Sequence, residues 1–301
     1  MSSFKTVIFI VGPTAVGKTS LAIDLANELG CEIISADSRQ FYKDISIGTA
    51  KPSAEELSKA KHHFIDFLGL QELYSAGDFE RDALSFLEDY FQNNSVCICA
   101  GGSGLYVSAL LYGLDDLPSS KSIRAELNEF YLNEGIEALQ RELKEKDPEH
   151  YAAMDIHNKH RLIRALEVCR ASGEKYSQLR TSSKKERPFK SIILGLNRDR
   201  EELYDRINRR VDIMLDDGLL DEVKSVMPMK HINALQTVGF REIFASYDGE
   251  YDMDEAIRLV KRNSRRFAKR QVTWFKRYEE IMWFNPQDYN SIVAETKALL
   301  K

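Results

Sequence analysis

The sequence predicts an α/β fold in which a parallel sheet is flanked by helices and carries an inserted, all-helical subdomain. Apolar, strand-like runs alternate with helical segments in the first part of the chain, which is the pattern of βαβ units. A glycine-rich loop joins the first of these runs to the helix that follows it. After Pro118 the apolar residues instead recur at threes and fours, and strand character returns only at Ser191–Leu196.

Length and composition are those of an ordinary globular protein. The chain has 301 residues, of which 43% are hydrophobic and 30% charged, enough for one large or two smaller domains. No apolar run approaches the about 20 residues that a membrane helix needs. The first residues, MSSFK, lack the apolar stretch of a secretory signal, so we expect a cytoplasmic location. Four cysteines without paired spacing favour neither a disulfide framework nor a zinc site.

A phosphate-binding loop follows the first strand-like run, Lys5–Val11. It matches the pattern G-x-x-x-x-G-K-[ST] and consists of Gly12, Pro13, Thr14, Ala15, Val16, Gly17, Lys18 and Thr19. The glycines let backbone N–H groups and the end of the next helix, Ser20–Leu29, point at phosphate oxygens, and Lys18 adds a positive charge. The hydroxyl of Thr19 is a candidate magnesium ligand. The pattern predicts a P-loop NTPase-like fold, but it does not show which phosphate ester is bound.

Two further strand-like runs end in polar residues that should lie beside this loop. Glu32–Ala36 leads into Asp37, and Val96–Ala100 leads into a glycine-rich turn that contains Ser103. Ligands of open α/β sheets bind outside the carboxyl ends of the strands, so both residues are site candidates. Asp37 can act as a general base, bind magnesium through water or simply cap the next turn. The turn with Ser103 stands where many nucleoside triphosphatases carry an acidic magnesium ligand, which disfavours ordinary ATP hydrolysis.

The helical block sets the expected domain boundaries. Residues 1–117 and 198–301 should form the catalytic core with C-terminal basic helices, and residues 118–197 the inserted helical subdomain. The expected helices of the insert are Ile123–Leu132, Ile136–Leu143 and Asn158–Arg170, followed by an exit hinge at Thr181–Pro188. Arg161 and Arg164 lie one turn apart, a spacing that suits either a phosphate clamp or ordinary surface ion pairs.

A strongly basic segment near the end of the chain contrasts with the net charge of −5. Residues 258–277 hold nine basic and no acidic side chains, whereas the other 281 residues hold 33 basic and 47 acidic ones. Phe267, Trp274 and Phe275 lie among these charges, a mixture that single-stranded or looped nucleic acid favours. The alternative interpretation is a solvated amphipathic helix.

Eight segments, in order along almost the whole chain, carry a family resemblance. They are GPTAVGKT at 12–19, SADSRQFY at 35–42, GTAKP at 48–52, HHFID at 62–66, GGSGLY at 101–106, HRLIRALEV at 160–168, QTVGFRE at 236–242 and RRFAKRQVTWF at 265–275. Together they resemble the tRNA dimethylallyltransferase family, also called tRNA isopentenyltransferases. The chain lacks the Cys/His zinc-finger extension of eukaryotic cytosolic relatives, so it is more similar to the bacterial type.

The resemblance implies a reaction and its partners. A dimethylallyl group would pass from dimethylallyl diphosphate to N6 of the adenosine immediately 3′ of the anticodon, in tRNAs that read codons beginning with U. The products would be N6-dimethylallyladenosine and diphosphate. The resemblance also implies Mg²⁺ as cofactor and the anticodon stem-loop of tRNA as partner, without a membrane, and we expect a monomer.

The same resemblance implies roles for individual residues. Asp37 resembles the catalytic aspartate, which would accept the N6 proton, and Ser103 stands where the family usually has threonine. Lys18 would grip the diphosphate, with magnesium at Thr19. Arg210 resembles the arginine that reaches the diphosphate, and the arginine one turn earlier would be its companion.

Several segments resemble those that hold the tRNA. Their residues are Asp37, Ser38, Arg39, Gln40, Ser103, Arg124, Arg161, Leu162, Ile163, Arg164, Ala165, Gln236, Thr237, Val238, Gly239, Phe240, Arg241, Lys269, Arg270, Gln271, Val272, Thr273, Trp274, Phe275 and Lys276. Many family members have tyrosine and lysine in place of Phe240 and Arg241, so ring and charge are preserved here.

Three other functions fit parts of this pattern. A P-loop kinase for a small molecule would explain the loop and magnesium but leaves the basic segment without a role. A prenyltransferase for free adenine nucleotides would share the catalytic half without needing the helical insert. A non-catalytic tRNA-binding protein would have little use for a phosphate-binding loop beside Asp37.

Overall fold

The computed structural model describes residues 5–181 and 183–301. The chain start, where we expect no secretory signal, and residue 182 of the expected hinge lie outside the described residues. The chain divides into two compact units: unit 1 comprises Met1–Leu111 and Arg187–Lys301, and unit 2 comprises Tyr112–Glu186. Unit 2 thus starts at residue 112 instead of the expected 118 and ends at residue 186 instead of 197. The end differs because the strand Lys190–Leu196 hydrogen-bonds to the first strand of the chain and belongs to unit 1.

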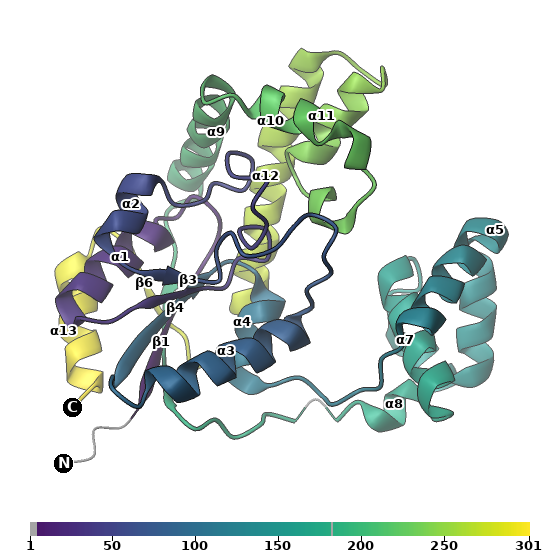
Figure 1. Ribbon diagram of the computed structural model, residues 1–301, viewed down its shortest axis with the longest axis horizontal. Coiled ribbons are helices and arrows are strands. Elements are labelled where there is room, and N and C mark those ends of the chain that lie inside the picture. Colours follow the sequence, from purple (N-terminus) through teal and green to yellow (C-terminus); the bar gives the residue numbers. More distant parts are fainter. Residues whose placement is uncertain (1–4, 182) are drawn as a thin grey trace. The chain divides into compact units, whose positions relative to one another are not determined.

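A six-stranded parallel sheet forms the centre of unit 1 (Figure 1). Its strands are β1 (Thr6–Val11), β2 (Ile33–Ser35), β3 (His62–His63), β4 (Val96–Gly101), β5 (Lys190–Leu196) and β6 (Met282–Phe284). They lie in the order β3-β2-β4-β1-β5-β6. In the middle of the sheet Ile8 pairs with Ile98 on one side and Ile192 on the other. The predicted fold class is confirmed, and the two edge strands β3 and β6 are additions that were too short to show a pattern.

Helices cover both faces of the sheet. Those of unit 1 are α1 (Lys18–Leu29), α2 (Ala54–Lys59), α3 (Ala76–Tyr90), α4 (Gly104–Tyr112), α9 (Arg200–Asp216), α10 (Leu219–Ser225), α11 (Phe240–Tyr247), α12 (Met253–Phe275) and α13 (Tyr289–Leu299), with short 3₁₀ turns at Met227–Met229 and Asn233–Leu235. The crossings from β1 to β2 and from β3 to β4 run in opposite directions along the sheet. Because parallel crossovers are right-handed, α1 and α3 therefore lie on opposite faces.

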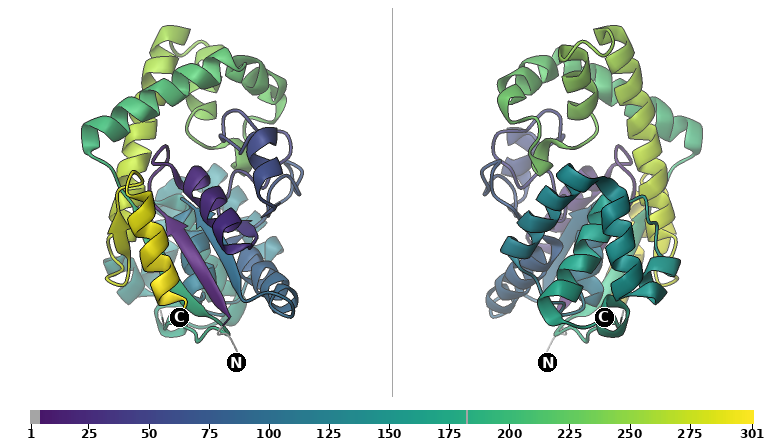
Figure 2. Two further views of the ribbon diagram at one scale, coloured as in Figure 1. Left: turned by 90° about the vertical axis from the view of Figure 1, so that its left-hand side faces the viewer. Right: turned by 90° about the vertical axis from the view of Figure 1, so that its right-hand side faces the viewer.

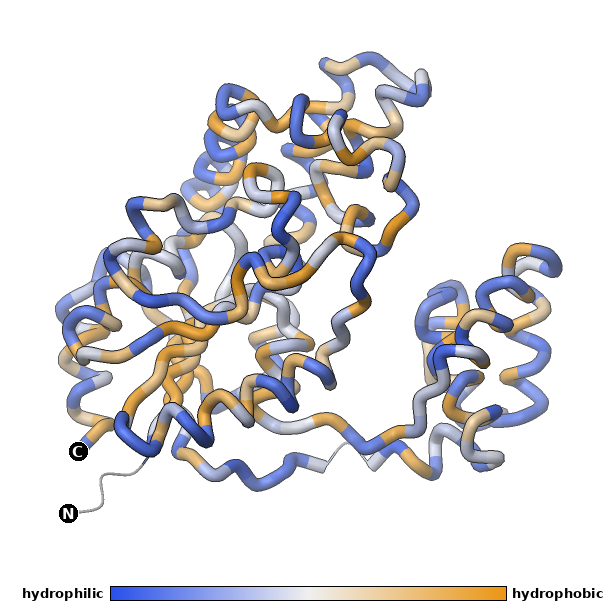
Figure 3. Tube along the Cα trace, viewed as in Figure 1, coloured by the Kyte–Doolittle hydropathy of each residue, from blue (hydrophilic) through white to orange (hydrophobic). Residues whose placement is uncertain are grey.

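The main core packs α1 and α13 against one face of the sheet, as Figure 2 shows. Ile8 and Ile10 of β1 lie in this core with Leu25 of α1 and Ile292 of α13, all at most 4% exposed. The strands appear as the hydrophobic centre of unit 1 in Figure 3. Since both faces are covered, β1 is buried along its whole length, which explains why it reads as a continuous apolar run.

Unit 2 is entirely helical in its described part. Its helices are α5 (Lys121–Lys146), α6 (Pro148–Ala153), α7 (Lys159–Ser172) and α8 (Tyr176–Leu179). Gly135 has φ 78° and breaks α5 between the two helices that the sequence predicts there. Leu127, Leu139 and Leu166 form its small core. The buried carboxylate of Asp147 accepts hydrogen bonds from the backbone N–H groups of His150 and Ser177, and so ties α6 to α8.

A membrane-spanning helix and a metal-binding cluster of side chains are two features that the sequence does not indicate. Within the described residues no helix is both long and apolar enough to cross a membrane. In the same part of the chain, no group of three or more His, Cys, Asp or Glu side chains is arranged to hold a metal ion.

We expect Gly101→Ala to destabilise unit 1. A Cβ atom at this position would lie 2.3 Å from the backbone oxygen of Ala36, so β2 and β4 would have to shift. Overpacking of this kind costs about 1–3 kcal/mol, which a lower midpoint of urea unfolding would report. The control is Gly77→Ala inside α3, where space exists and alanine favours the helix, so its midpoint should rise or stay the same. An unchanged midpoint for Gly101→Ala would contradict this packing argument.

Candidate active site

The glycine-rich loop leaves β1 and ends where α1 begins. Gly12 has φ +148°, and a Cβ atom there would lie 2.5 Å from the backbone oxygen of Leu196, so only glycine fits. Gly17, in the left-handed region, precedes the first helical residue, Lys18. The ammonium group of Lys18 donates to the backbone oxygen of Pro13 at 2.8 Å. Burial lowers the pKa of Lys18 to about 8, the nearby carboxylate of Asp37 opposes this shift, and the charge of Arg210 adds to it.

Three arginines that follow β5 reach the same loop. The Nε atoms of Arg198 and Arg206 donate to the backbone oxygens of Val16 and Ala15 at 2.9 and 2.8 Å. Arg210 donates to the hydroxyl of Thr14 at 3.3 Å. Arg198 is ion-paired with the carboxylate at position 202, whereas neither of the other two has a carboxylate within ion-pair distance among the described residues. The excess positive charge around the loop suits an anion with several charges, such as a diphosphate.

Burial affects the electrostatics of two of these arginines. It lowers the pKa of both Arg206 and Arg210, since a charged guanidinium loses hydration inside the protein. In the case of Arg210 the carboxylate of Asp37 partly offsets this effect. A bound anion would supply the missing counter-charge, so the predicted role of Arg210 agrees with its surroundings.

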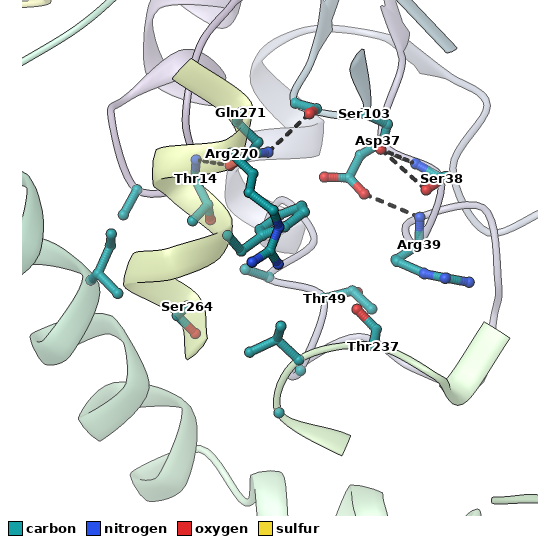
Figure 4. Close-up of a pocket in the computed structure, with 18 of the residues that line it drawn as sticks. Thr14, Asp37, Ser38, Arg39, Thr49, Ser103, Thr237, Ser264, Arg270 and Gln271 are labelled. Atoms are coloured by element: carbon teal, nitrogen blue, oxygen red, sulfur yellow. Dashed lines mark hydrogen bonds between the residues drawn. The ribbon is translucent and has the colours of Figure 1, made fainter. Parts of the chain in front are cut away.

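Asp37 and Ser103 lie together at the carboxyl ends of β2 and β4 (Figure 4). A carboxylate oxygen of Asp37 accepts a hydrogen bond from the backbone N–H of Arg39 at 3.1 Å. The hydroxyl of Ser103 accepts from the backbone N–H of Ser38 at 2.9 Å and donates to the Ser38 hydroxyl at 3.1 Å. The capping interpretation of Asp37 therefore holds for one oxygen, and the other oxygen makes no hydrogen bond to the described residues.

Two cavities meet at the glycine-rich loop. The larger, of about 540 Å³, is lined by Asp37 and Ser103, and part of it is drawn in Figure 4. The smaller, of about 460 Å³, is lined by Thr19. Arg210 and Ala50 line both cavities, so a diphosphate bound on the loop would be accessible from either side.

The side chains around Thr19 fit a magnesium ion that is shared with a bound phosphate. Glu56, Asp66 and Asp217 line the same cavity as Thr19, and oxygen atoms are the ligands that Mg²⁺ prefers. Asp66 is already paired with Lys51. Mg²⁺ usually keeps several waters and binds one or two protein oxygens plus substrate phosphates, so a protein-only cage is not required of such a site.

Residues 46–51, between β2 and α2, contribute to the lining of both cavities. The carboxylate of Glu222 in α10 accepts hydrogen bonds from three consecutive backbone N–H groups, those of Ser46, Ile47 and Gly48, at 2.7–2.8 Å. A Cβ atom at Gly48 would lie 2.5 Å from the ring of Phe240. The loop then presents the backbone oxygen of Ala50 to Arg210 at 3.3 Å and to the side chain at position 40 at 3.0 Å.

The structure separates the predicted RNA-binding residues of unit 1 into exposed and buried ones. Thr237, Arg241 and Arg270 line the larger cavity. Lys269 is exposed on α12, and Lys276, which directly follows this helix, is exposed as well. The others that line this cavity are Ser38, Arg39, Gln236, Val238, Gly239 and Trp274. By contrast, the side chains of Phe240 and Phe275 are at most 1% exposed and do not line the cavity, whereas Gln271 is 7% exposed and also lines it. The prediction of a side-chain contact with RNA is therefore not supported for Phe240 and Phe275, which pack inside the unit, and for Gln271 it stays a prediction.

The RNA-binding prediction for unit 2 divides in the same way. Leu162, Ile163 and Ala165 lie in the core of the unit, since this face of α7 packs on α5, and contact with RNA is not supported for their side chains. Arg124 and Arg164 both bind the buried carboxylate of Glu167, and Arg164 also donates to the backbone oxygens of Pro118 and Leu117. Arg161 is exposed and forms no ion pair with the described residues.

Comparison with known proteins identifies the family. The model of a family described as IPP transferase matches residues 40–278. A tRNA dimethylallyltransferase from Christiangramia forsetii is 50% identical over 278 residues, which cover 92% of each chain. The chain belongs to the IPP transferase family. The family that the motifs resemble is thereby confirmed.

Solved structures are similar to this IPP transferase over nearly its whole length. The tRNA isopentenylpyrophosphate transferase of Bacillus halodurans is 36% identical with a TM-score of 0.73, over 98% of this chain and 97% of that one. A eukaryotic dimethylallyltransferase, described as acting on tRNA, is 26% identical with a TM-score of 0.80, over 98% of this chain and 78% of that one.

Sequence reasoning missed two groups at the site of this IPP transferase. Arg198 follows the carboxyl end of β5 beside β1, so the strand-end rule that selected Asp37 could have found it. Glu222 carries no such signal, because its partners are backbone N–H groups far away in the sequence.

We expect diphosphate binding to weaken above about pH 8, where Lys18 loses its proton. Below this pH the ammonium group of Lys18 is charged and attracts the anion. Because the bound anion favours the charged form of Lys18, diphosphate binding at pH 8 should be accompanied by uptake of protons by the protein. Titration calorimetry of inorganic diphosphate with Mg²⁺, in two buffers of different ionisation enthalpy, measures this uptake. The control is Lys18→Arg, which stays charged throughout and should take up fewer protons. Equal uptake by both proteins would contradict the assignment.

Proposed function

We propose that this protein is a tRNA dimethylallyltransferase that forms N6-dimethylallyladenosine immediately 3′ of the anticodon. The observation that carries the proposal is that Thr14 and Arg210, from the anion-binding side, line the same cavity as Asp37 and Ser103. A diphosphate leaving group and a base for the attacking amine are thus available at one place. The names of the similar proteins support the same activity.

The donor side of the site would stabilise the departing diphosphate. As the allylic C–O bond of dimethylallyl diphosphate breaks, negative charge grows on the bridging oxygen and positive charge on the prenyl carbon. Lys18 and Arg210, with the backbone N–H groups of the loop, would bind the growing negative charge. Mg²⁺ at Thr19, when bound, would neutralise further charge on the diphosphate.

The acceptor side would remove a proton from the adenine. The lone pair of N6 is delocalised into the ring, so attack on the prenyl carbon improves when a base withdraws an N6 proton as the new C–N bond forms. The oxygen of Asp37 that is free of hydrogen bonds to the described residues is the candidate acceptor. Ser103 lies beside it and would orient the substrate through its hydroxyl. The adenine must be flipped out of its stack to reach this place.

The surface that α12 presents would bind the RNA backbone. Lys269, Arg270 and Lys276 are exposed and have no ion pairs with the described residues, whereas Arg258 and Lys261 nearer the start of the helix are paired with acidic side chains. The exposed end of the helix thus retains its charge for phosphates. The monomeric state and the cytoplasmic location expected from the sequence stay predictions.

Transfer of labelled prenyl groups tests the proposed function. Purified protein with Mg²⁺ and labelled dimethylallyl diphosphate is mixed with an unmodified anticodon stem-loop, or with the same stem-loop carrying guanosine at the target position. Label should enter only the first RNA. Label in free AMP but not in RNA would instead support a nucleotide prenyltransferase, and consumption of ATP with a small acceptor would support a kinase.

We expect Asp37→Asn to reduce single-turnover transfer by about 10²–10⁴-fold, because the amide cannot accept the N6 proton. Affinity for the stem-loop should stay near the wild-type value. Asp44→Asn serves as the control, since Asp44 is an exposed carboxylate that lines neither cavity. Rapid-quench measurement of labelled RNA gives the rates. Wild-type transfer by Asp37→Asn would exclude the role as base.

Lys269→Ala should weaken binding of all stem-loop sequences alike and flatten the dependence of log Kd on log salt by about one charge. The reason is that an exposed lysine neutralises phosphate without reading bases. Lys297→Ala on α13, whose lysine pairs with Glu28, is the matched control and should change neither quantity. Fluorescence anisotropy at several salt concentrations measures both, and a loss confined to one RNA sequence would contradict a backbone contact.

A further inference from the structure

Gln271 occupies an unusual place on α12. Its neighbours in the chain, Lys269 and Arg270, are exposed, but its own side chain is 7% exposed and turns into unit 1. Figure 4 shows it between the glycine-rich loop and the turn that carries Ser103. The sequence resemblance placed Gln271 among the RNA contacts. The residue does line the larger cavity, but both ends of its amide are engaged by backbone groups of the protein.

Both ends of the Gln271 amide are hydrogen-bonded to the backbone of the active site. Its oxygen accepts from the N–H of Thr14 at 2.8 Å, and its nitrogen donates to the carbonyl oxygen of Gly102 at 2.9 Å. A Cβ atom at Gly102 would lie 2.3 Å from that nitrogen, so the fit is tight. In the described part of the chain, no other side chain joins these two backbone segments by hydrogen bonds.

Each partner of Gln271 is adjacent to a group of the proposed reaction. The hydroxyl of Thr14 accepts from Arg210, which would bind the diphosphate. Gly102 directly precedes Ser103, whose hydroxyl holds the segment after Asp37 through Ser38. A small displacement of α12 would therefore move the donor loop and the acceptor turn together, because a buried hydrogen-bonded amide transmits movement of the helix to its partners.

We propose that Gln271 is a positioning residue that couples RNA binding on the exposed face of α12 to diphosphate binding on the glycine-rich loop. This inference rests on the proposed function. Coupling between two sites is reciprocal, so RNA should tighten the binding of diphosphate by the same factor by which diphosphate tightens the binding of RNA. We expect a factor of about five or more, the lower end of typical coupling.

Two substitutions remove the bridge in different ways. Gln271→Met has a similar length but neither donates nor accepts, so both hydrogen bonds are lost. Gln271→Glu keeps an acceptor for the N–H of Thr14 but cannot donate to Gly102, and it keeps the test open if the apolar variant fails to fold. Thr296→Val is the control, because it removes a buried hydroxyl hydrogen bond from α13 in the same unit without touching the site.

The experiment measures the affinity of inorganic diphosphate with Mg²⁺ by calorimetry, with and without a saturating unmodified anticodon stem-loop. Wild type and Thr296→Val should show the coupling factor, whereas in both Gln271 variants it should fall to near one, with the affinity for RNA alone within about two-fold of wild type. A factor that is near one in the wild type, or unchanged in both Gln271 variants, overturns the inference. A wild-type protein that binds neither diphosphate nor stem-loop overturns the proposed function as well.

Discussion

The parallel alignment of β2, β4, β1 and β5 is the constraint on which the site of unit 1 depends. Because the four strands point the same way, their carboxyl ends meet at one edge of the sheet. That edge receives the glycine-rich loop from β1, Asp37 from β2, Ser103 from β4 and Arg198 from β5. These residues are far apart in the sequence, and they lie together only because the strands pair in this order.

Close backbone packing gives this edge its shape. Glycine is needed where β4 passes Ala36, where the loop at position 48 meets the ring of Phe240, and where α4 begins against Trp274. In each case a Cβ atom would lie less than 3 Å from a neighbouring atom. In the same region the backbone oxygen of Ala50 accepts hydrogen bonds from the side chains of Arg210 and Gln40.

Two partly buried arginines of the site have no counter-charge at ion-pair distance among the described residues. Arg206 and Arg210 are brought together without carboxylates at ion-pair distance in the described residues, although burial of a cation is unfavourable. At the start of α12, in contrast, Arg258 and Lys261 are neutralised by Glu255 and Asp212. The attraction of an anion depends mainly on nearby cations that have no counter-charge, since more distant charges are screened. A chain with a negative net charge can therefore still attract an anionic donor and RNA at these places.

The sequence by itself determined the fold class, the family and the local motifs. Continuous apolar runs such as Lys5–Val11 indicated buried parallel strands, and the loop pattern after it indicated an anion site, because both depend on neighbouring residues alone. Only the tertiary structure decided which residues of a motif face the ligand. Leu162, Phe240 and Phe275 lie in segments that resemble RNA-binding ones, yet their side chains are buried and line neither cavity. The physical reason is that the hydrogen-bond partners of Gln271 and Glu222 lie more than a hundred residues away in the sequence. The local spacing of residues does not encode such long-range contacts or the burial that results from them.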